Sequence, residues 1–167
     1  MNRDVIAVGC NHVFQCDDGR GDAGLNHDRS EFRAFIESLV NERGIKFIGE
    51  ESHDRYNSFA QEVAEEQHIR WINIDVPRDI RDKLGVPEDG HGHPDIISEE
   101  YSEAWNKFRE WYMIREFRNE ICDAKSAMVI CGRSHLEAIA RELGRHNWLR
   151  LTCVCFRLRH PDEQHDR

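Results

Sequence analysis

Two short apolar runs in this chain end in glycine, and a histidine follows each glycine three residues later. They read VIAVGCNH at 5–12 and AMVICGRSH at 127–135. A strand with one exposed face alternates apolar and polar residues, whereas a strand of a parallel sheet is covered on both faces and is apolar throughout. The two runs therefore predict central strands of a parallel sheet, which limits the chain to an α/β fold.

Strand-like and helical segments alternate along the rest of the sequence. Apolar residues recur at helical spacing around 32–40 and 59–66, and a longer helix is predicted over about 98–123. Alternation of this kind is typical of βαβ units, so we expect a mostly parallel sheet of about five strands with helices on both faces. The predicted strands are 4–9, 44–49, 69–75, 126–132 and 148–156.

The length of 167 residues predicts one α/β domain, over 1–160, with a short tail at 161–167. Two polar, glycine-rich segments are predicted to be loops, CDDGRGDAGLNHDRS at 16–30 and VPEDGHGHPD at 86–95. The second loop contains an HGH motif that is a weaker candidate for metal binding.

Composition restricts the partners and the location. The net charge of −9 argues against nucleic acid or an anionic membrane as the partner. The sequence has neither a membrane-length apolar run nor an apolar signal segment, so we predict a cytoplasmic protein.

The six cysteines lack regular spacing, which predicts free thiols. Cys153 and Cys155 share one strand face with Leu149 and Leu151 and are predicted to face the core.

Polar and ionisable residues follow the predicted strands. Ligands of an open parallel sheet bind beyond the carboxyl ends of its strands, so we expect these residues to share one crevice. Gly-x-x-His also occurs at 24–27 and 90–93, and only its position after a buried strand distinguishes the other two copies. The residues at the strand ends are His12, Glu50, Glu51, His53, Arg55, Asp75 and His135.

His135 begins a predicted helix. SHLE has the form of a capping box, with Ser134 as the N-cap and Glu137 as its partner. The positive end of the helix dipole disfavours an imidazolium ion there, and a neutral imidazole suits either a metal ligand or a general base.

Glu50 and Glu51 should point to opposite sides of the sheet, since side chains alternate along a strand. One carboxylate beside two histidines would make a three-ligand site for Mn²⁺, Zn²⁺ or Fe²⁺, with an open position for water. Without a metal, a carboxylate would instead polarise a histidine that activates water.

The predicted helix at 98–123 supplies candidates for substrate binding. Arg115 and Arg118 can hold an anionic group bidentately, and Asn119 lies on the same side as Arg115. The alternative is surface ion pairing of these arginines with neighbouring glutamates.

These motifs resemble those of the superfamily that contains TraB-type proteins, Tiki-type metalloproteases, erythromycin esterases and ChaN-like haem-binding proteins. The GEESH segment at 49–53 matches the Gly-Glu-x-x-His motif of the esterases. The chain departs from the pattern at Cys10 and Asn11 and is shorter than the larger relatives. The positions matching Tiki and TraB relatives are Gly9, His12, Glu51, Arg55, Arg118, Asn119, Gly132 and His135.

The resemblance implies a metal-dependent hydrolase acting on a small molecule or peptide. His12, Glu51 and His135 would bind the metal, and Glu50 or His53 would serve as base. Arg118 would orient the substrate, and Arg55, Arg115 and Asn119 would help to bind it. Two alternatives remain: a metal-free esterase centred on Glu50 and His53, and a non-catalytic protein that binds haem or another small ligand.

Overall fold

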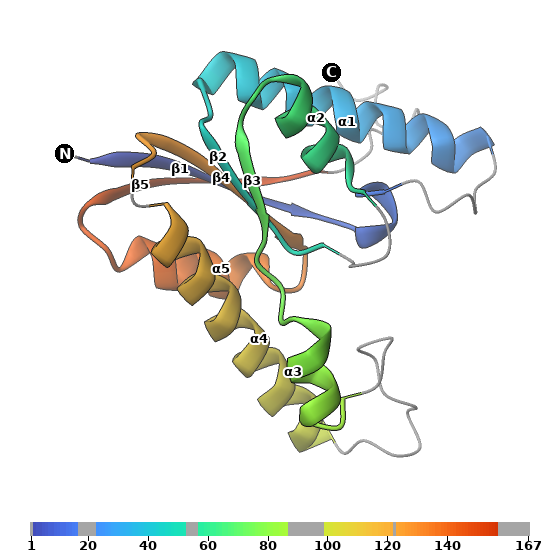
Figure 1. Ribbon diagram of the computed structural model, residues 1–167, viewed down its shortest axis with the longest axis vertical. Helices are drawn as coiled ribbons and strands as arrows, with labels where there is room; N and C mark the ends of the chain where they lie inside the picture. The colour runs from blue at the N-terminus through green and yellow to red at the C-terminus, as the bar shows by residue number, and fades with distance from the viewer. Residues whose placement is uncertain (1, 17–22, 53–56, 87–98, 122, 157–167) are drawn as a thin grey trace, which may run out of the picture.

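The computed structural model describes residues 2–16, 23–52, 57–86, 99–121 and 123–156. Five parallel strands form one sheet in the order β3-β2-β4-β1-β5 (Figure 1). This sheet confirms the predicted α/β fold. The strands are β1 (Arg3–Cys10), β2 (Phe47–Glu50), β3 (Arg70–Asn73), β4 (Ser126–Gly132) and β5 (Leu149–Cys155). The helices are η1 (His12–Phe14), α1 (Ala23–Arg43), α2 (Phe59–Glu66), α3 (Arg78–Lys83), α4 (Glu99–Glu120) and α5 (Leu136–Gly144).

Helices cover both faces of the sheet, as predicted. Phe32 and Ile36 of α1 and Val63 of α2 are buried in the core on one face. Phe117 of α4 and Leu143 of α5 are buried in the core on the other face. Because both faces are covered, the central strands β1 and β4 need apolar residues at nearly every position.

The strand β5 lies at one side of the sheet, beside β1 only. The prediction that its cysteines face the core is wrong for Cys153, which is exposed, while Cys155 is partly buried. The alternating pattern identified a strand correctly, but it did not show that a strand at the side of the sheet is less well covered. The five described cysteines are free thiols, as expected.

Two helices begin elsewhere than the sequence predicts. The helix α1 starts at Ala23, so the second half of the predicted 16–30 loop is helical, and Leu25 extends its apolar stripe onto the core. The helix α5 starts at Leu136, with His135 at the N-cap position and no side-chain capping bond. The predicted capping box of Ser134 and Glu137 is therefore not formed, although His135 still lies at the helix N-terminus.

The connections after β1 and β4 leave the sheet on opposite faces. The chain passes from β1 to α1 on one face and from β4 to α5 on the other, and the two strands are neighbours. Adjacent strands whose connections diverge leave a crevice between their carboxyl ends, where α/β proteins bind ligands. His12 and His135 follow these two strands.

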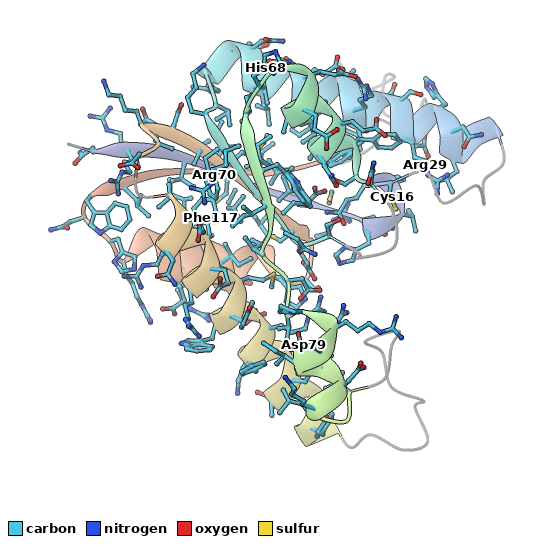
Figure 2. All side chains as sticks on the ribbon, in the orientation of Figure 1. Cys16, Arg29, His68, Arg70, Asp79 and Phe117 are labelled. Atoms are coloured by element: carbon cyan, nitrogen blue, oxygen red, sulfur yellow. The ribbon has the colours of Figure 1, made fainter. Side chains whose placement is uncertain are left out.

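The helix α4 runs antiparallel to the strands. Its last residue, Glu120, pairs with Arg70 at the start of β3, so the C-terminal end of α4 lies at the amino ends of the strands. Figure 2 shows Arg70 and Phe117 close to this end of the helix. The first half of α4 extends past the carboxyl ends, where Trp105 packs with Val76 and Val86 in a small third core. None of the helices in the described ranges has the length and apolarity needed to span a membrane.

Candidate functional site

Glu51 is the centre of a polar cluster at the carboxyl ends of the strands. Its N–H donates to the carbonyl of Ile130 at 2.8 Å, which continues the pairing of β2 with β4 by one residue. Its side chain is 2% exposed. Oε2 accepts the backbone N–H of Gly132 at 2.7 Å, and Oε1 accepts Nη2 of Arg109 at 2.6 Å. Glu51 is therefore fixed by groups from two other elements.

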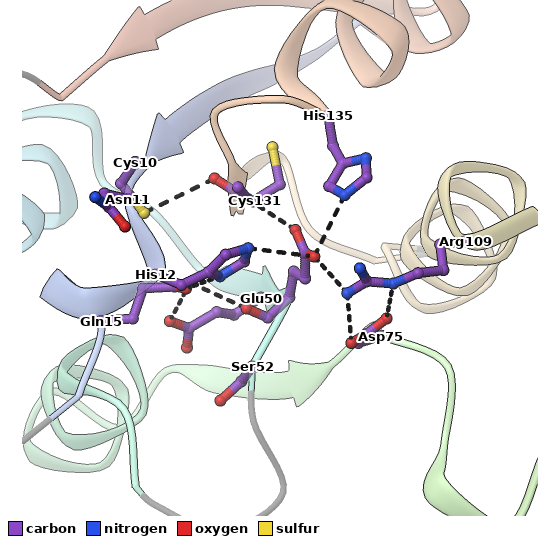
Figure 3. A network of polar contacts seen from close by, with 12 residues as sticks. Cys10, Asn11, His12, Gln15, Glu50, Ser52, Asp75, Arg109, Cys131 and His135 are labelled. Carbon is purple, nitrogen blue, oxygen red and sulfur yellow. Dashed lines mark hydrogen bonds and ion pairs between the residues drawn. The ribbon is translucent and has the colours of Figure 1, made fainter. Parts of the chain in front are cut away.

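Both predicted histidines point at the same oxygen of Glu51. Nε2 of His12 is 3.5 Å from Oε1, and Nε2 of His135 is 3.7 Å from it. In Figure 3, dashed lines join His12, His135 and Arg109 to one carboxylate oxygen, which is Oε1 of Glu51. The structure therefore brings His12 and His135 to one carboxylate, although they are more than 120 residues apart in the sequence. Both distances are longer than those of ordinary N–H···O hydrogen bonds, so neither imidazole is hydrogen-bonded to Glu51 in this arrangement.

The tautomer of His12 is set by Gln15. The amide nitrogen of Gln15 donates to Glu50 Oε1 at 3.1 Å and to the carbonyl of Glu51 at 3.0 Å. Its oxygen therefore faces Nδ1 of His12, at 2.6 Å. An amide oxygen only accepts, so Nδ1 must donate the hydrogen. A neutral His12 then directs the lone pair of Nε2 toward Glu51.

Glu110 holds His135 in the same way. Nδ1 of His135 is 3.0 Å from Oε1 of Glu110, a carboxylate that accepts its hydrogen. The lone pair of Nε2 in a neutral His135 is again directed at Glu51. Histidines that bind metals commonly donate their second N–H to a carboxylate or carbonyl oxygen.

Arg109 joins the ends of two strands. Its Nε and Nη2 donate to the carboxylate of Asp75, after β3, at 3.0 and 2.8 Å, while Nη2 also donates to Glu51. Burial alone would lower the pKa of Arg109, but the charges and hydrogen bonds of Asp75 and Glu51 raise it overall. Arg109 is thus a permanent cation at this site.

The cluster carries an excess of negative charge. The cluster contains three carboxylates and one guanidinium: Arg109 pairs with Glu51 and Asp75, while Glu110 contacts His135. With neutral histidines two negative charges remain uncompensated by protein groups in this cluster. Buried charge is costly unless it is paired, so a divalent cation or two imidazolium ions would balance the cluster.

Glu50 occupies a separate environment on the other side of β2. Its carboxylate is 0% exposed and accepts hydrogen bonds from Ser58, Trp71 and Gln15. Burial raises the pKa of Glu50 to about 7, although these hydrogen bonds lower it in part. Glu51 instead contacts Arg109 of α4, so the two carboxylates do point to opposite sides, as the alternation predicted. Glu50 does not face the crevice, and this position gives no support to its predicted role as base.

As the side chains stand, the described residues contain no group of three or more His, Cys, Asp and Glu side chains placed to hold a metal ion. The cation that contacts Glu51 is Arg109. The donor set nevertheless suits a divalent metal, because it combines two imidazole nitrogens and one carboxylate oxygen.

The arginines predicted to bind substrate lie away from the crevice. Arg118 and Asn119 are exposed, and Arg118 follows Arg109 by nine residues, or roughly 13 Å along a helix axis. Arg115 is exposed and stacks over Trp111 with 5.4 Å between its guanidinium carbon and the ring centre. The antiparallel course of α4 explains this, because its C-terminal half passes toward the amino ends of the strands. The other predicted residues, His53, Arg55 and the HGH motif at 91–93, lie outside the described ranges.

Three residues of the cluster were not predicted: Gln15, Arg109 and Glu110. Arg109 had a signal in the sequence, because it interrupts a column of apolar residues spaced by four on α4. Trp105 precedes it and Met113 follows it, and both are buried. A charged residue in a buried column needs a partner, and here the partners are the strand-end carboxylates.

Gly132 gives a test of how closely the cluster is packed. A Cβ at this position would lie 2.5 Å from Nε2 of His12 and 3.4 Å from Oε2 of Glu51. We expect Gly132→Ala to displace His12 and to lower the free energy of unfolding by about 1–3 kcal/mol, as overpacking does. Denaturant titration measures this. Gly144→Ala is the control, since the described residues leave open space there. Equal stability of the two variants would contradict the packing described here.

No protein family model, no curated protein and no solved structure matches this chain. The resemblance to TraB, Tiki and esterase proteins therefore remains a prediction from short motifs.

Proposed function

We propose that this protein is a metal-dependent hydrolase in which His12, Glu51 and His135 bind a divalent ion. One observation carries the proposal: both Nε2 atoms face the same oxygen of Glu51, at 3.5 and 3.7 Å, while each Nδ1 atom is held by an acceptor. That arrangement brings two imidazole nitrogens and one carboxylate oxygen close together at the carboxyl ends of the strands.

The two nitrogen–oxygen distances are close to those between ligands of one metal ion. Two ligands about 2.1 Å from a metal and separated by the tetrahedral angle lie about 3.4 Å apart. Nitrogen and carboxylate donors favour Zn²⁺, Mn²⁺ or Fe²⁺. Three protein ligands leave one position open, and an ion bound there would supply a water molecule acidified enough to attack a substrate at neutral pH.

The surrounding residues have supporting roles. Gln15 and Glu110 fix the tautomers of the two histidines, and Arg109 offsets part of the carboxylate charge. The side chain of His12 is 43% exposed and that of His135 is 5% exposed, so the cluster opens to solvent on the His12 side. A substrate would approach from that side.

Metal removal tests the proposal. An ion that binds only the folded protein stabilises it by about 2.7 kcal/mol at a hundredfold excess over its dissociation constant. We expect chelator-treated protein to melt at a lower temperature than protein with added Zn²⁺, Mn²⁺ or Fe²⁺, and calorimetric titration to give one ion per chain. A melting temperature that none of these ions changes would rule out the proposed site.

His27 provides the matched control, because it belongs to the Gly-x-x-His segment at 24–27 but lies on an exposed turn of α1, paired with Glu31. We expect His12→Gln to remove the stabilisation by metal and His27→Gln to keep it. Equal loss in both variants would show non-specific metal binding.

Hydrolysis is tested on the same preparations. We expect turnover of an activated aryl ester or a fluorogenic peptide that stops on chelation and returns with metal. Turnover unaffected by chelation would favour the metal-free alternative, and a visible absorption band on titration with haem would favour the binding alternative.

A further inference from the structure

The oxygen of Glu51 that would bind a metal already has a cation beside it. Nη2 of Arg109 is 2.6 Å from Oε1, closer than either histidine nitrogen. A divalent ion and a guanidinium repel each other, and a carboxylate oxygen bound closely by one is a poorer ligand for the other. Arg109 is therefore in direct competition with any ion that binds Glu51.

Arg109 can leave Glu51 without losing its other partner. Of its three hydrogen bonds to the two carboxylates, the two to Asp75 measure 3.0 and 2.8 Å, and only the third goes to Glu51. The bonds to Asp75 are already at hydrogen-bond distance, so a rotation of the guanidinium about Asp75, rather than a shift toward it, would free the oxygen of Glu51 and keep Arg109 paired.

We propose that Arg109 and Asp75 together set the cation affinity of this site, with Arg109 competing for Glu51 and Asp75 drawing it away. The inference depends on the proposed metal site. It predicts that substitutions of the two partners of this ion pair change the metal affinity in opposite directions. Removing Arg109 strengthens metal binding, whereas removing the carboxylate of Asp75 leaves Glu51 as the main partner of Arg109 and weakens metal binding.

Calorimetric titration of the full chain with Zn²⁺ and Mn²⁺ tests this on the wild type, Arg109→Gln, Asp75→Asn and the double variant. We expect Arg109→Gln to bind about tenfold more tightly than the wild type and Asp75→Asn about tenfold more weakly, effects of the size seen for groups around metal ligands. Because Asp75 acts through Arg109, adding Asp75→Asn to Arg109→Gln should change the affinity by less than about threefold.

The outcomes separate this inference from the proposed function. If the wild type binds metal and Arg109→Gln binds it no more tightly, Arg109 does not compete and the inference fails alone. If folded wild type and folded Arg109→Gln both bind no metal, the proposed function fails. If Asp75→Asn lowers the metal affinity equally in the wild type and in Arg109→Gln, Asp75 acts directly on the metal. That result also overturns the inference.

A measurement on the wild type does not depend on whether a variant folds. The Nε–H resonance of Arg109 should shift when diamagnetic Zn²⁺ is added and should remain protected from exchange with solvent, because Asp75 still accepts that hydrogen. A resonance that does not change on saturation with Zn²⁺ would overturn the inference, and loss of protection would show that Arg109 leaves Asp75 as well.

Discussion

Replacing Glu51 with glutamine should weaken metal binding by more than about a hundredfold, because a direct ligand matters more than the residues that orient ligands. The carboxylate of Glu51 accepts from Gly132 on one oxygen and from Arg109 on the other. The glutamine amide would turn its NH₂ toward one of these donors, which loses a hydrogen bond worth about 1–3 kcal/mol when buried. Calorimetric titration with Zn²⁺ and Mn²⁺ measures the affinity, and circular dichroism shows whether the fold is kept.

The adjacent carboxylate is the control for this prediction. Glu50→Gln changes the same chemical group one residue earlier, on the opposite side of β2, where its partners are Ser58, Trp71 and Gln15. We expect it to retain metal binding within about tenfold, with a residual effect passed through Gln15 to His12. If Glu50→Gln is inactive and Glu51→Gln resembles the wild type, the metal-free esterase alternative replaces our proposal.

The part of the cluster that was predicted from the sequence follows from local signals. Unbroken apolar runs identified β1 and β4 as central strands, and the end of each run identified His12 and His135. The alternation of side chains along β2 assigned Glu50 and Glu51 to opposite sides of the sheet. Each of these inferences needed only the backbone geometry of a strand and the rule that parallel strands present their carboxyl ends together.

Local signals in the sequence could not show which arginine of α4 joins the cluster. Helical spacing shows which side of α4 is buried, but it does not show how far the helix slides along the sheet. That position is set by packing, with Phe117 against Phe47 at a ring separation of 5.5 Å and Glu120 against Arg70. This places Arg109, and not Arg118, level with the carboxyl ends of the strands.

The remaining differences also depend on tertiary structure. The partners of the two histidines, Gln15 and Glu110, depend on side-chain conformations that no spacing rule gives. The exposure of Cys153 depends on strand order, since β5 would be covered on both sides if it were central. The motif resemblance favoured Arg118 and Asn119 because they match a sequence pattern, whereas the structure shows them exposed beyond the cluster.

Glu50 should make the stability of the protein fall as the pH rises. Its pKa is about 7 in the folded protein against an ordinary value of 4.5, because the carboxylate is fully buried. The folded state therefore holds the proton more tightly than the unfolded state, and stability that is fully present below the unfolded pKa is lost as the pH rises through about 7. At about 1.4 kcal/mol for each pH unit of the shift, the loss amounts to about 3 kcal/mol.

Denaturant titration of the wild type and Glu50→Gln between about pH 4.5 and pH 8 measures this contribution, since the amide does not titrate in this range. Over that interval the wild type should lose about 3 kcal/mol of unfolding free energy relative to the variant, whatever constant difference the lost hydrogen bonds add. Glu65→Gln, on the exposed surface of α2, should follow the wild type at every pH. Parallel curves for the wild type and Glu50→Gln would mean that Glu50 has the same affinity for protons in the folded and unfolded chains, and that its burial is offset completely by Ser58, Trp71 and Gln15.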